Sequence, residues 1–292
     1  MWQSIEGSLV HKSTPNQVLL LSADPSPDGT LRLMVALSPG HPSAVFLPSA
    51  STLVGVELMR QCAIAFAHLS GGVPRGWAFI MNQLSFAWLD GAMPMAPEQF
   101  TGHVDVRLRA VKMRRDQVSE LQLEADFMAE GVMLGTGCGD LTCLPPKTYQ
   151  AIRRNAPTAA IVNTGPLGAI LADIHQFDGG LEAQLVWNRG DTFIFDHASD
   201  HVSGMLLASA LLQSHRLLMG SQAGDFSMQC HNFGEYDAPI TVSGVAHGAG
   251  RTVVTMSQSG RIIASGQCGK AVGSAAAARA GERFNRALTP AV

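Results

Sequence analysis

Short apolar runs, some continuous and some alternating with polar residues, are spaced along the first half of the chain. The two runs at 18–21 and 31–35 have the length and alternation of strands. After a stretch rich in Pro, Gly and Ser at 38–51, a mostly apolar segment of about five turns covers 52–69 and stops at Gly71. This segment predicts a helix closed by glycine. Four strand-like runs follow it: 78–88, 103–111, 120–127 and 132–135.

The second half of the chain repeats this order of elements. Runs at 183–187 and 192–195 predict strands, and a polar loop then leads into an apolar helix at 204–219 that stops at Gly220. Four more runs predict strands after this helix: 226–233, 240–246, 252–257 and 262–266. The same plan therefore occurs twice.

The two predicted helices can be aligned residue by residue. Glu57 to Gln61 of the first helix lie opposite Ser209 to Gln213 of the second, and both halves later carry a Cys-Gly pair, at Cys138 and at Cys268. A mostly apolar helix followed by an antiparallel meander indicates a sheet wrapped round a long central helix. We therefore expect an α+β fold of tandem double-hotdog type, because two repeats supply each other's partner within one chain.

The repeat also predicts how the chain divides. We expect a first hotdog repeat at 1–150, a connector at 151–170, a second repeat at 171–272 and a tail at 273–292.

Composition removes several classes of function. The 292 residues are 46% hydrophobic and 15% charged with a net charge of −3, so neither nucleic acid nor an anionic membrane is an expected partner. The first twenty residues lack the pattern of a signal peptide, and no apolar run is long enough to span a bilayer, so we expect a cytoplasmic protein. The five cysteines are odd in number and scattered, which favours reduced thiols over disulfides. We expect neither a metal site nor a cofactor.

Glu57, Arg60 and Gln61 share one face of the first helix, because they are spaced i, i+3 and i+4. Most of that helix is apolar, where a carboxylate and a guanidinium are costly unless they pair or line a pocket. Two interpretations stay open for Glu57. One is an ion pair with Arg60 that stabilises the helix; the other is a base with a raised pKa beside a cationic anchor.

Two Asp-His pairs lie four residues apart just before the second helix: Asp196-His197 and Asp200-His201. Histidine suits proton transfer near neutral pH, and a neighbouring carboxylate can fix its tautomer. The start of the helix at Gly204 and Met205 offers N–H groups that can polarise a carbonyl oxygen. The alternative is that Asp200 is an ordinary N-terminal cap and His201 is solvated.

Neither half holds the full set of candidate residues. The first half has no Asp-His loop before its helix, and the second half has Ser209 and Leu212 where the first has Glu57 and Arg60. In a paired hotdog the acid-base residues of one site can come from opposite partners. We therefore expect one complete site, in which His197 or His201 meets Glu57 across the two halves, and one degenerate site.

The chain resembles the A-factor (γ-butyrolactone autoinducer) biosynthesis hotdog proteins over about residues 8 to 270. Glu57-x-x-Arg60-Gln61 resembles their first-half helix motif, and the segment from Phe195 to Met205 resembles their second-half signature. Two further segments are similar to family motifs: Val10-His11-Lys12…Asn16-Gln17-Val18-Leu19-Leu20 and Phe233-Gly234-Glu235-Tyr236-Asp237-x-Pro239.

The resemblance implies an acyltransferase of secondary metabolism that makes a signalling molecule. Such an enzyme joins a β-ketoacyl thioester, carried on acyl carrier protein or coenzyme A, to the hydroxyl of dihydroxyacetone phosphate or a similar acceptor, on the way to a butyrolactone, butenolide or furan. It implies catalytic roles for Glu57, His197, Asp200 and His201. It implies substrate-binding roles for five further residues: Arg60, Gln61, Gly204, Met205 and Gln213.

Departures from the family pattern keep other readings open. Family members usually carry Glu and Arg where this chain has Ser209 and Leu212, and Pro in place of Ser203. A hotdog dehydratase or thioesterase acting on acyl carrier protein is one alternative, because a loop histidine and a helix carboxylate also suit dehydration. A non-catalytic acyl-binding hotdog is another. A homodimer is possible through the outer sheet edges.

Overall fold

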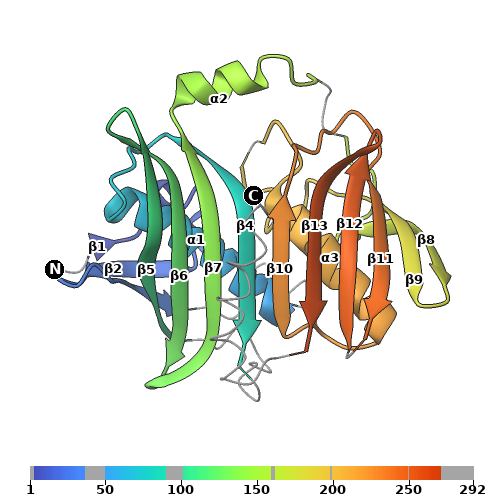
Figure 1. Ribbon diagram of the computed structural model, residues 1–292, viewed down its shortest axis with the longest axis horizontal. Coiled ribbons are helices and arrows are strands. Elements are labelled where there is room, and N and C mark those ends of the chain that lie inside the picture. The colour runs from blue at the N-terminus through green and yellow to red at the C-terminus, as the bar shows by residue number, and fades with distance from the viewer. Residues whose placement is uncertain are drawn as a thin grey trace, which may run out of the picture.

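The computed structural model describes residues 3–36, 50–89, 101–158, 162–197, 199–248 and 250–270. Two long helices lie on one face of a broad curved antiparallel sheet, and a third, short helix stands apart from it (Figure 1). The long helices are α1 (Ala50–Leu69) and α3 (Gly204–Met219), and the short one is α2 (Pro146–Arg153). Helices at 52–69 and 204–219 were predicted, and both are confirmed.

Seven strands precede α2: β1 (Gln3–Ser4), β2 (Leu20–Pro25), β3 (Leu31–Ala36), β4 (Ala78–Trp88), β5 (Thr101–Arg114), β6 (Gln117–Ala129) and β7 (Val132–Leu144). Six follow it: β8 (Leu171–Phe177), β9 (Gly180–Leu185), β10 (Asp225–Cys230), β11 (Thr241–His247), β12 (Arg251–Gln258) and β13 (Arg261–Gly269). In the described part of the chain these strands form one sheet in the order β1-β2-β3-β5-β6-β7-β4-β10-β13-β12-β11-β9-β8.

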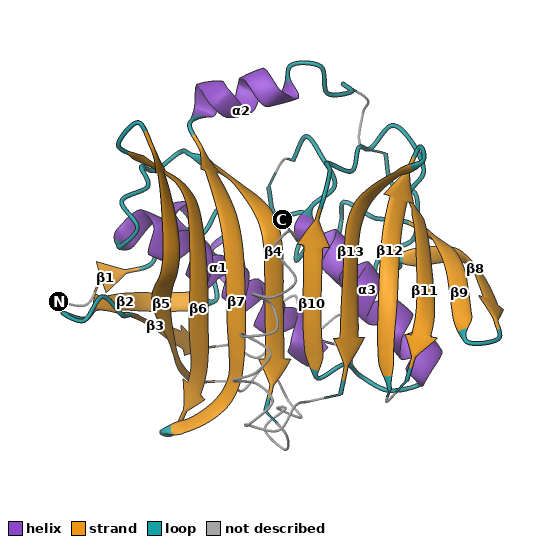
Figure 2. Cartoon of the chain, in the orientation of Figure 1, coloured by secondary structure: helices purple, strands orange, loops and turns teal. Residues whose placement is uncertain are grey.

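The two halves of the sheet meet at β4 and β10. These strands pair antiparallel, with Phe226 opposite Phe86 and Met228 opposite Leu84. Helix α1 packs on β4 and β7, whereas α3 packs on β11, β12 and β13, so each half of the sheet covers its own helix (Figure 2). The predicted hotdog arrangement of sheet and central helix is confirmed. Strand β10, where the two halves of the sheet join, contacts both long helices.

Each long helix is apolar on nearly all sides because the sheet and the other helix surround it. Leu58, Met59 and Phe66 of α1 and Leu206 and Leu211 of α3 are at most 2% exposed. Burying one such side chain contributes roughly 1.5–3 kcal/mol. Helix α3 begins at a Ser203 cap and ends at Gly220, whose positive φ of 65° lets its N–H reach the Arg216 carbonyl.

The structure corrects three sequence expectations. Residues 192–194 form a turn held by Asp191 instead of a strand, because the Phe195 N–H donates to the Asp191 carbonyl at 2.8 Å. Helix α2, which was not predicted, spans the expected boundary between the first repeat and the connector. Strand β8 was missed because it is an exposed edge strand without apolar periodicity. Most of the stretch at 38–51 and the tail at 273–292 lie outside the described residues, and the domain boundaries stay a prediction.

Candidate active site

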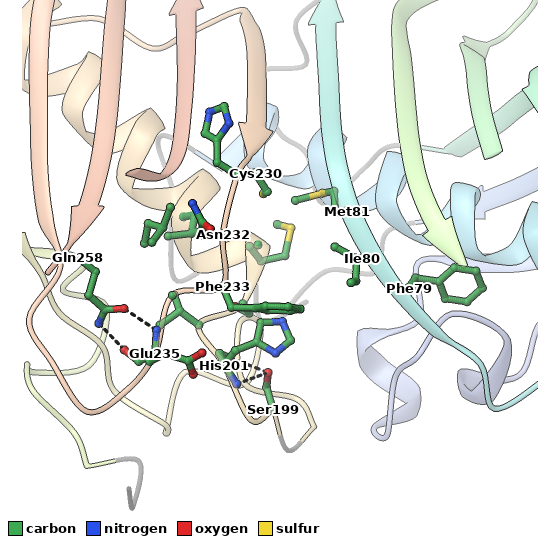
Figure 3. A pocket seen from close by; sticks show the side chains of 18 of the residues that line it. Phe79, Ile80, Met81, Ser199, His201, Cys230, Asn232, Phe233, Glu235 and Gln258 are labelled. Atoms are coloured by element: carbon green, nitrogen blue, oxygen red, sulfur yellow. Dashed lines mark hydrogen bonds between the residues drawn. The ribbon is translucent and has the colours of Figure 1, made fainter. Parts of the chain in front are cut away.

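A pocket of about 740 Å³ opens between the two halves of the chain. The first half contributes His11, Lys12 and Arg60, together with apolar side chains of β4. The second half contributes the Asp-His loop, the start of α3 and the segment that follows β10. Figure 3 shows Ile80 and Met81 of β4 facing Cys230 and Phe233 across the pocket. Residues of both repeats therefore line this pocket.

Glu57 lies directly behind the pocket floor and has no exposed surface. Its carboxylate accepts hydrogen bonds from Arg60 Nε at 2.7 Å and Arg60 Nη2 at 2.8 Å. Gln61 Nε2 donates to it at 2.8 Å, and Lys12 Nζ lies 3.1 Å away. Lys12 and Arg60 line the pocket, whereas Glu57 does not. Glu57 thus holds two cations in place from behind.

The electrostatics of Glu57 are those of an ion pair. Burial by itself would raise its pKa, but the charges of Arg60 and Lys12 and the hydrogen bonds from Arg60 and Gln61 outweigh burial and lower the pKa to about 2. The alternative from the sequence, a base with a raised pKa, is therefore wrong. Glu57 stays ionised at neutral pH, and its lone pairs are already engaged.

The turn that precedes the Asp-His loop is fastened to the first half of the chain. The Asp196 carboxylate accepts from the backbone N–H of Ser13 at 2.5 Å and of Thr14 at 3.0 Å. Lys12 Nζ also reaches the Phe193 carbonyl at 3.5 Å. These contacts bring the loop that carries His197 over the floor formed by Lys12 and Arg60.

His197 and His11 are neutral imidazoles in a positive environment. Burial, followed by the charges of Arg60 and Lys12, lowers the pKa of His197. Burial and the charge of Arg60 lower the pKa of His11 to about 4. Both rings line the pocket, so each can offer an unprotonated nitrogen at neutral pH.

His201 is held by a carboxylate. Its Nδ1 lies 2.7 Å from Asp200 Oδ1, and its ring packs edge-on against Phe233 with centroids 4.8 Å apart. The pKa of Asp200 is lowered: burial would raise it, but hydrogen bonds from Tyr149, His201 and Arg153 prevail. An ionised Asp200 can only accept, so Nδ1 carries the proton and Nε2 is the basic nitrogen. The loop is fixed further by Ser199, whose Oγ donates to the His201 carbonyl at 2.7 Å (Figure 3).

The N-terminus of α3 forms part of the pocket wall at Ser203, Gly204 and Met205. Ser203 Oγ accepts from the Leu206 N–H at 3.2 Å, which caps the helix. A Cβ on Gly204 would lie 2.5 Å from the Met81 methyl group, so glycine brings this backbone close to β4. The positive end of the helix therefore faces the pocket near His201.

Four of the predicted site residues do not line the pocket: Asp200, Glu57, Gln61 and Gln213. Glu57 supports the floor, and Gln61 is buried, where its amide bonds to the Leu19 N–H and the Gln17 carbonyl. Gln213 of α3 does not line the pocket either. The structure brings together five of the predicted residues at the pocket wall: Arg60, His197, His201, Gly204 and Met205.

Sequence reasoning did not assign roles to Lys12, His11, Tyr149 or Arg153. Lys12 and His11 belong to the opening motif, which was the available signal. Tyr149 and Arg153 lie in α2, at the expected boundary between the first repeat and the connector, and carried no signal.

Within the described residues, no three His, Cys, Asp or Glu side chains gather in a way that could hold a metal ion. No helix in that part of the chain is both long and apolar enough to cross a membrane.

The fold and the shared pocket define a hotdog-fold protein. Solved structures with this fold include a MaoC-like dehydratase, with a TM-score of 0.51 and 13% identity over 82% of this chain and 95% of that one. An acyl-ACP thioesterase from Bacteroides thetaiotaomicron has a TM-score of 0.51 and 8% identity over 83% of this chain and 98% of that one. At these identities the likeness concerns the fold alone.

The chain belongs to the A-factor biosynthesis hotdog domain family, whose model matches residues 1–145 and 154–272. It is 27% identical over 276 residues to the 2-oxo-3-(phosphooxy)propyl 3-oxoalkanoate synthase of Streptomyces coelicolor, covering 88% of each chain. It is 23% identical over 262 residues to the enzyme of the same name from Streptomyces virginiae, covering 83% of this chain and 87% of that one.

Proposed function

We propose that this protein is an acyltransferase that moves a β-ketoacyl group from a thioester to the hydroxyl of dihydroxyacetone phosphate or a similar phosphorylated acceptor. The thioester is carried by acyl carrier protein or coenzyme A. The observation that carries the proposal is a pocket lined by the cationic side chains of Lys12 and Arg60 together with the imidazoles of His197 and His201. The names of the related synthases describe the ester that this transfer would form.

The cations at the pocket floor suit a phosphate. Lys12 and Arg60 present two cationic side chains at the pocket floor beside the neutral His11 and His197, whereas the carboxylates of Glu57 and Asp196 that interact with Arg60 do not line the pocket. Arg60 Nε and Nη2 bond to Glu57 and to the Val10 carbonyl. Among the described residues no hydrogen bond engages Nη1, which leaves this nitrogen for a phosphate oxygen.

The walls above the floor suit an acyl chain. Ile80 and Met81 of β4, Leu207 of α3 and Ile263 of β13 give the pocket an apolar side. Burial of methylene groups there contributes about 0.8 kcal/mol for each CH₂ group. The acyl chain and the phosphate would thus occupy different parts of one pocket.

His201 is the base in this proposal. Its Nε2 takes the proton from the acceptor hydroxyl as the oxygen attacks the thioester carbonyl carbon, and Asp200 stabilises the imidazolium. The carbonyl oxygen becomes an oxyanion, which N–H groups at the start of α3 stabilise. When the intermediate collapses, the carbon–sulfur bond breaks and the thiolate takes the proton from His201. His197, neutral beside the phosphate, orients the acceptor by hydrogen bonding.

The test is mass spectrometry of products from the purified protein with a β-ketoacyl thioester and dihydroxyacetone phosphate. We expect a phosphorylated ester and one equivalent of free thiol. His201→Gln should abolish ester formation. Arg60→Lys should raise KM for the phosphorylated acceptor more than it lowers kcat, because it removes the planar guanidinium.

Dihydroxyacetone without its phosphate is the matched control substrate. With this acceptor, wild type and Arg60→Lys should react at similar low rates, because dihydroxyacetone has no phosphate for the cation at position 60 to bind. Thioester that stays intact with several acyl lengths would refute the transfer. Loss of water from a β-hydroxyacyl thioester in a parallel reaction would favour a dehydratase instead.

A further inference from the structure

Helix α2 connects the two repeats and reaches the Asp-His loop from outside the pocket. Tyr149 Oη donates to Asp200 Oδ1 at 2.6 Å and lies 3.3 Å from His201 Nδ1. Arg153 Nε donates to Asp200 Oδ2 at 2.9 Å, and its Nη2 donates to the Asp200 carbonyl at 2.8 Å. Both oxygens of the Asp200 carboxylate are therefore held by side chains of one turn of α2.

Arg153 is itself anchored on the other side of the loop. Its Nη1 and Nη2 donate to the two carboxylate oxygens of Glu235 at 2.6 and 2.8 Å. The guanidinium carbon lies 4.5 Å from the centre of the Phe233 ring, the same ring that packs against His201. The Arg153 side chain is only 8% exposed, whereas the Asp200 side chain that it holds is 44% exposed.

The segment that carries Phe233 and Glu235 is also held by hydrogen bonds with the side chain of Gln258. The Gln258 side chain accepts from the Glu235 N–H and donates to the Glu235 carbonyl, both at 2.8 Å (Figure 3). Arg153 thus ties together two rigid supports: α2 and the segment after β10. Asp200 lies between them and cannot rotate without breaking hydrogen bonds to both Tyr149 and Arg153.

We propose that Tyr149 and Arg153 are positioning residues for catalysis: by holding the Asp200 carboxylate, they keep His201 in the tautomer that directs its unprotonated Nε2 into the pocket. The connector helix is then a part of the active site rather than a passive link between the repeats. The kinetic consequence rests on the proposed acyl transfer, whereas the tautomer does not depend on any substrate.

The experiment uses the full chain with nitrogen-labelled histidine. Two-dimensional proton–nitrogen NMR distinguishes an imidazole protonated at Nδ1 from one protonated at Nε2, and His201→Gln identifies the signal. We expect wild-type His201 to be protonated at Nδ1. Tyr149→Phe and Arg153→Met should give a mixture of tautomers, and Arg153→Lys should fall between wild type and Arg153→Met. The adjacent, exposed Arg154 provides the matched control, and Arg154→Met should keep the wild-type spectrum.

The same variants are then assayed for ester formation. Tyr149→Phe should lower kcat by roughly 10- to 100-fold, the range for loss of one hydrogen bond to a charged group, with KM for the phosphorylated acceptor unchanged. Arg153→Met removes the hydrogen bonds to both Asp200 and Glu235, so its kcat should fall by at least as much. A thermal melt shows which variants are folded, and Tyr149→Phe removes a single oxygen atom from a half-buried side chain.

Two results would overturn the positioning role. One is a wild-type His201 that is not protonated at Nδ1. The other is a tautomer and a kcat that stay at wild-type values in both Tyr149→Phe and Arg153→Met. If the tautomer changes as expected but wild type makes no ester, the positioning role stands and the proposed reaction is wrong.

Discussion

The ion cluster around Glu57 makes a prediction that separates support of the site from catalysis. Glu57 has no exposed surface, and three side chains contact its carboxylate at 2.7 to 3.1 Å: Arg60, Gln61 and Lys12. Glu57→Gln keeps the shape of the side chain and one acceptor oxygen, but it removes the charge. Lys12 and Arg60 then remain together at the pocket floor without the carboxylate that pairs with both of them.

The cost of this change follows from burial. Breaking a buried ion pair by removing one partner costs about 3–5 kcal/mol. Because glutamine still accepts one hydrogen bond, we expect the lower end, about 3 kcal/mol of unfolding free energy. For a chain of this size that corresponds to a decrease in Tm of roughly 6 °C.

The pH dependence has a defined sign. The folded pKa of Glu57 is about 2 and its ordinary value is 4.5. A lowered folded pKa means that the contribution to stability is fully present above pH 4.5 and is lost as the pH falls towards 2. Urea unfolding between pH 7 and pH 3 should therefore show a loss of stability in wild type at the acid end that is smaller in Glu57→Gln.

A double-mutant cycle assigns the effect to the ion cluster. Lys12→Met removes one of the two cations, so Glu57→Gln in that background should cost less than it does in wild type. We expect a coupling free energy of about 1–3 kcal/mol. An unchanged Tm in Glu57→Gln together with zero coupling would refute the reasoning. If ester formation were then still lost, Glu57 would have a direct chemical role.

Three further predictions follow from the site and its supports. Lys12→Met should raise KM for a phosphorylated acceptor by about tenfold or more, and steady-state kinetics with and without the phosphate checks this. The pKa of His11 is lowered to about 4, so stability should fall as the pH decreases from 6.5 towards 4. Unfolding titrations of His11→Gln should show a smaller slope than wild type, because the lowered pKa of His197 still contributes to it. Ser203 has a φ of −69°, which suits proline, so Ser203→Pro should unfold within about 1 kcal/mol of wild type while Ser203→Ala loses about 1 kcal/mol of capping.

The long helices could be predicted because each is a long, mostly apolar run that is followed by glycine. Strand β7 was predicted only to residue 135, although it continues to Leu144. Its continuation alternates glycine with small or polar residues, which weakens the hydrophobic pattern. The glycines have a packing reason: a Cβ on Gly137 would lie 2.7 Å from the Met59 sulfur. Glycines in this strand leave the space in which α1 packs, and the sequence alone does not show that contact.

The motifs indicated many of the residues at the pocket, but they did not predict which of these residues form hydrogen bonds or ion pairs with one another. Asp196 and Ser13 are separated by 183 positions in the chain, and Arg153 and Glu235 by 82. No local pattern links such residues, because their contact depends on how the two repeats pair. Sequence spacing placed Glu57 beside Arg60 on one helix face. It could not decide between a base and an ion pair, since Lys12 comes from another segment.

The replacements in the second helix are consistent with a single shared site. Ser209 and Leu212 of α3 stand where α1 has Glu57 and Arg60, and both are buried. Ser209 Oγ donates to the Met205 carbonyl at 2.8 Å, so its only polar side-chain group is satisfied within its own helix. A second buried carboxylate with two cations would carry a desolvation cost of several kcal/mol for each ion. One pocket needs only one such cluster, because the first repeat supplies the cations and the second supplies the histidine loop and the helix N-terminus. Neither repeat contains all the groups of the pocket, and the backbone contacts of Asp196 with Ser13 and Thr14 are what bring the two sets together.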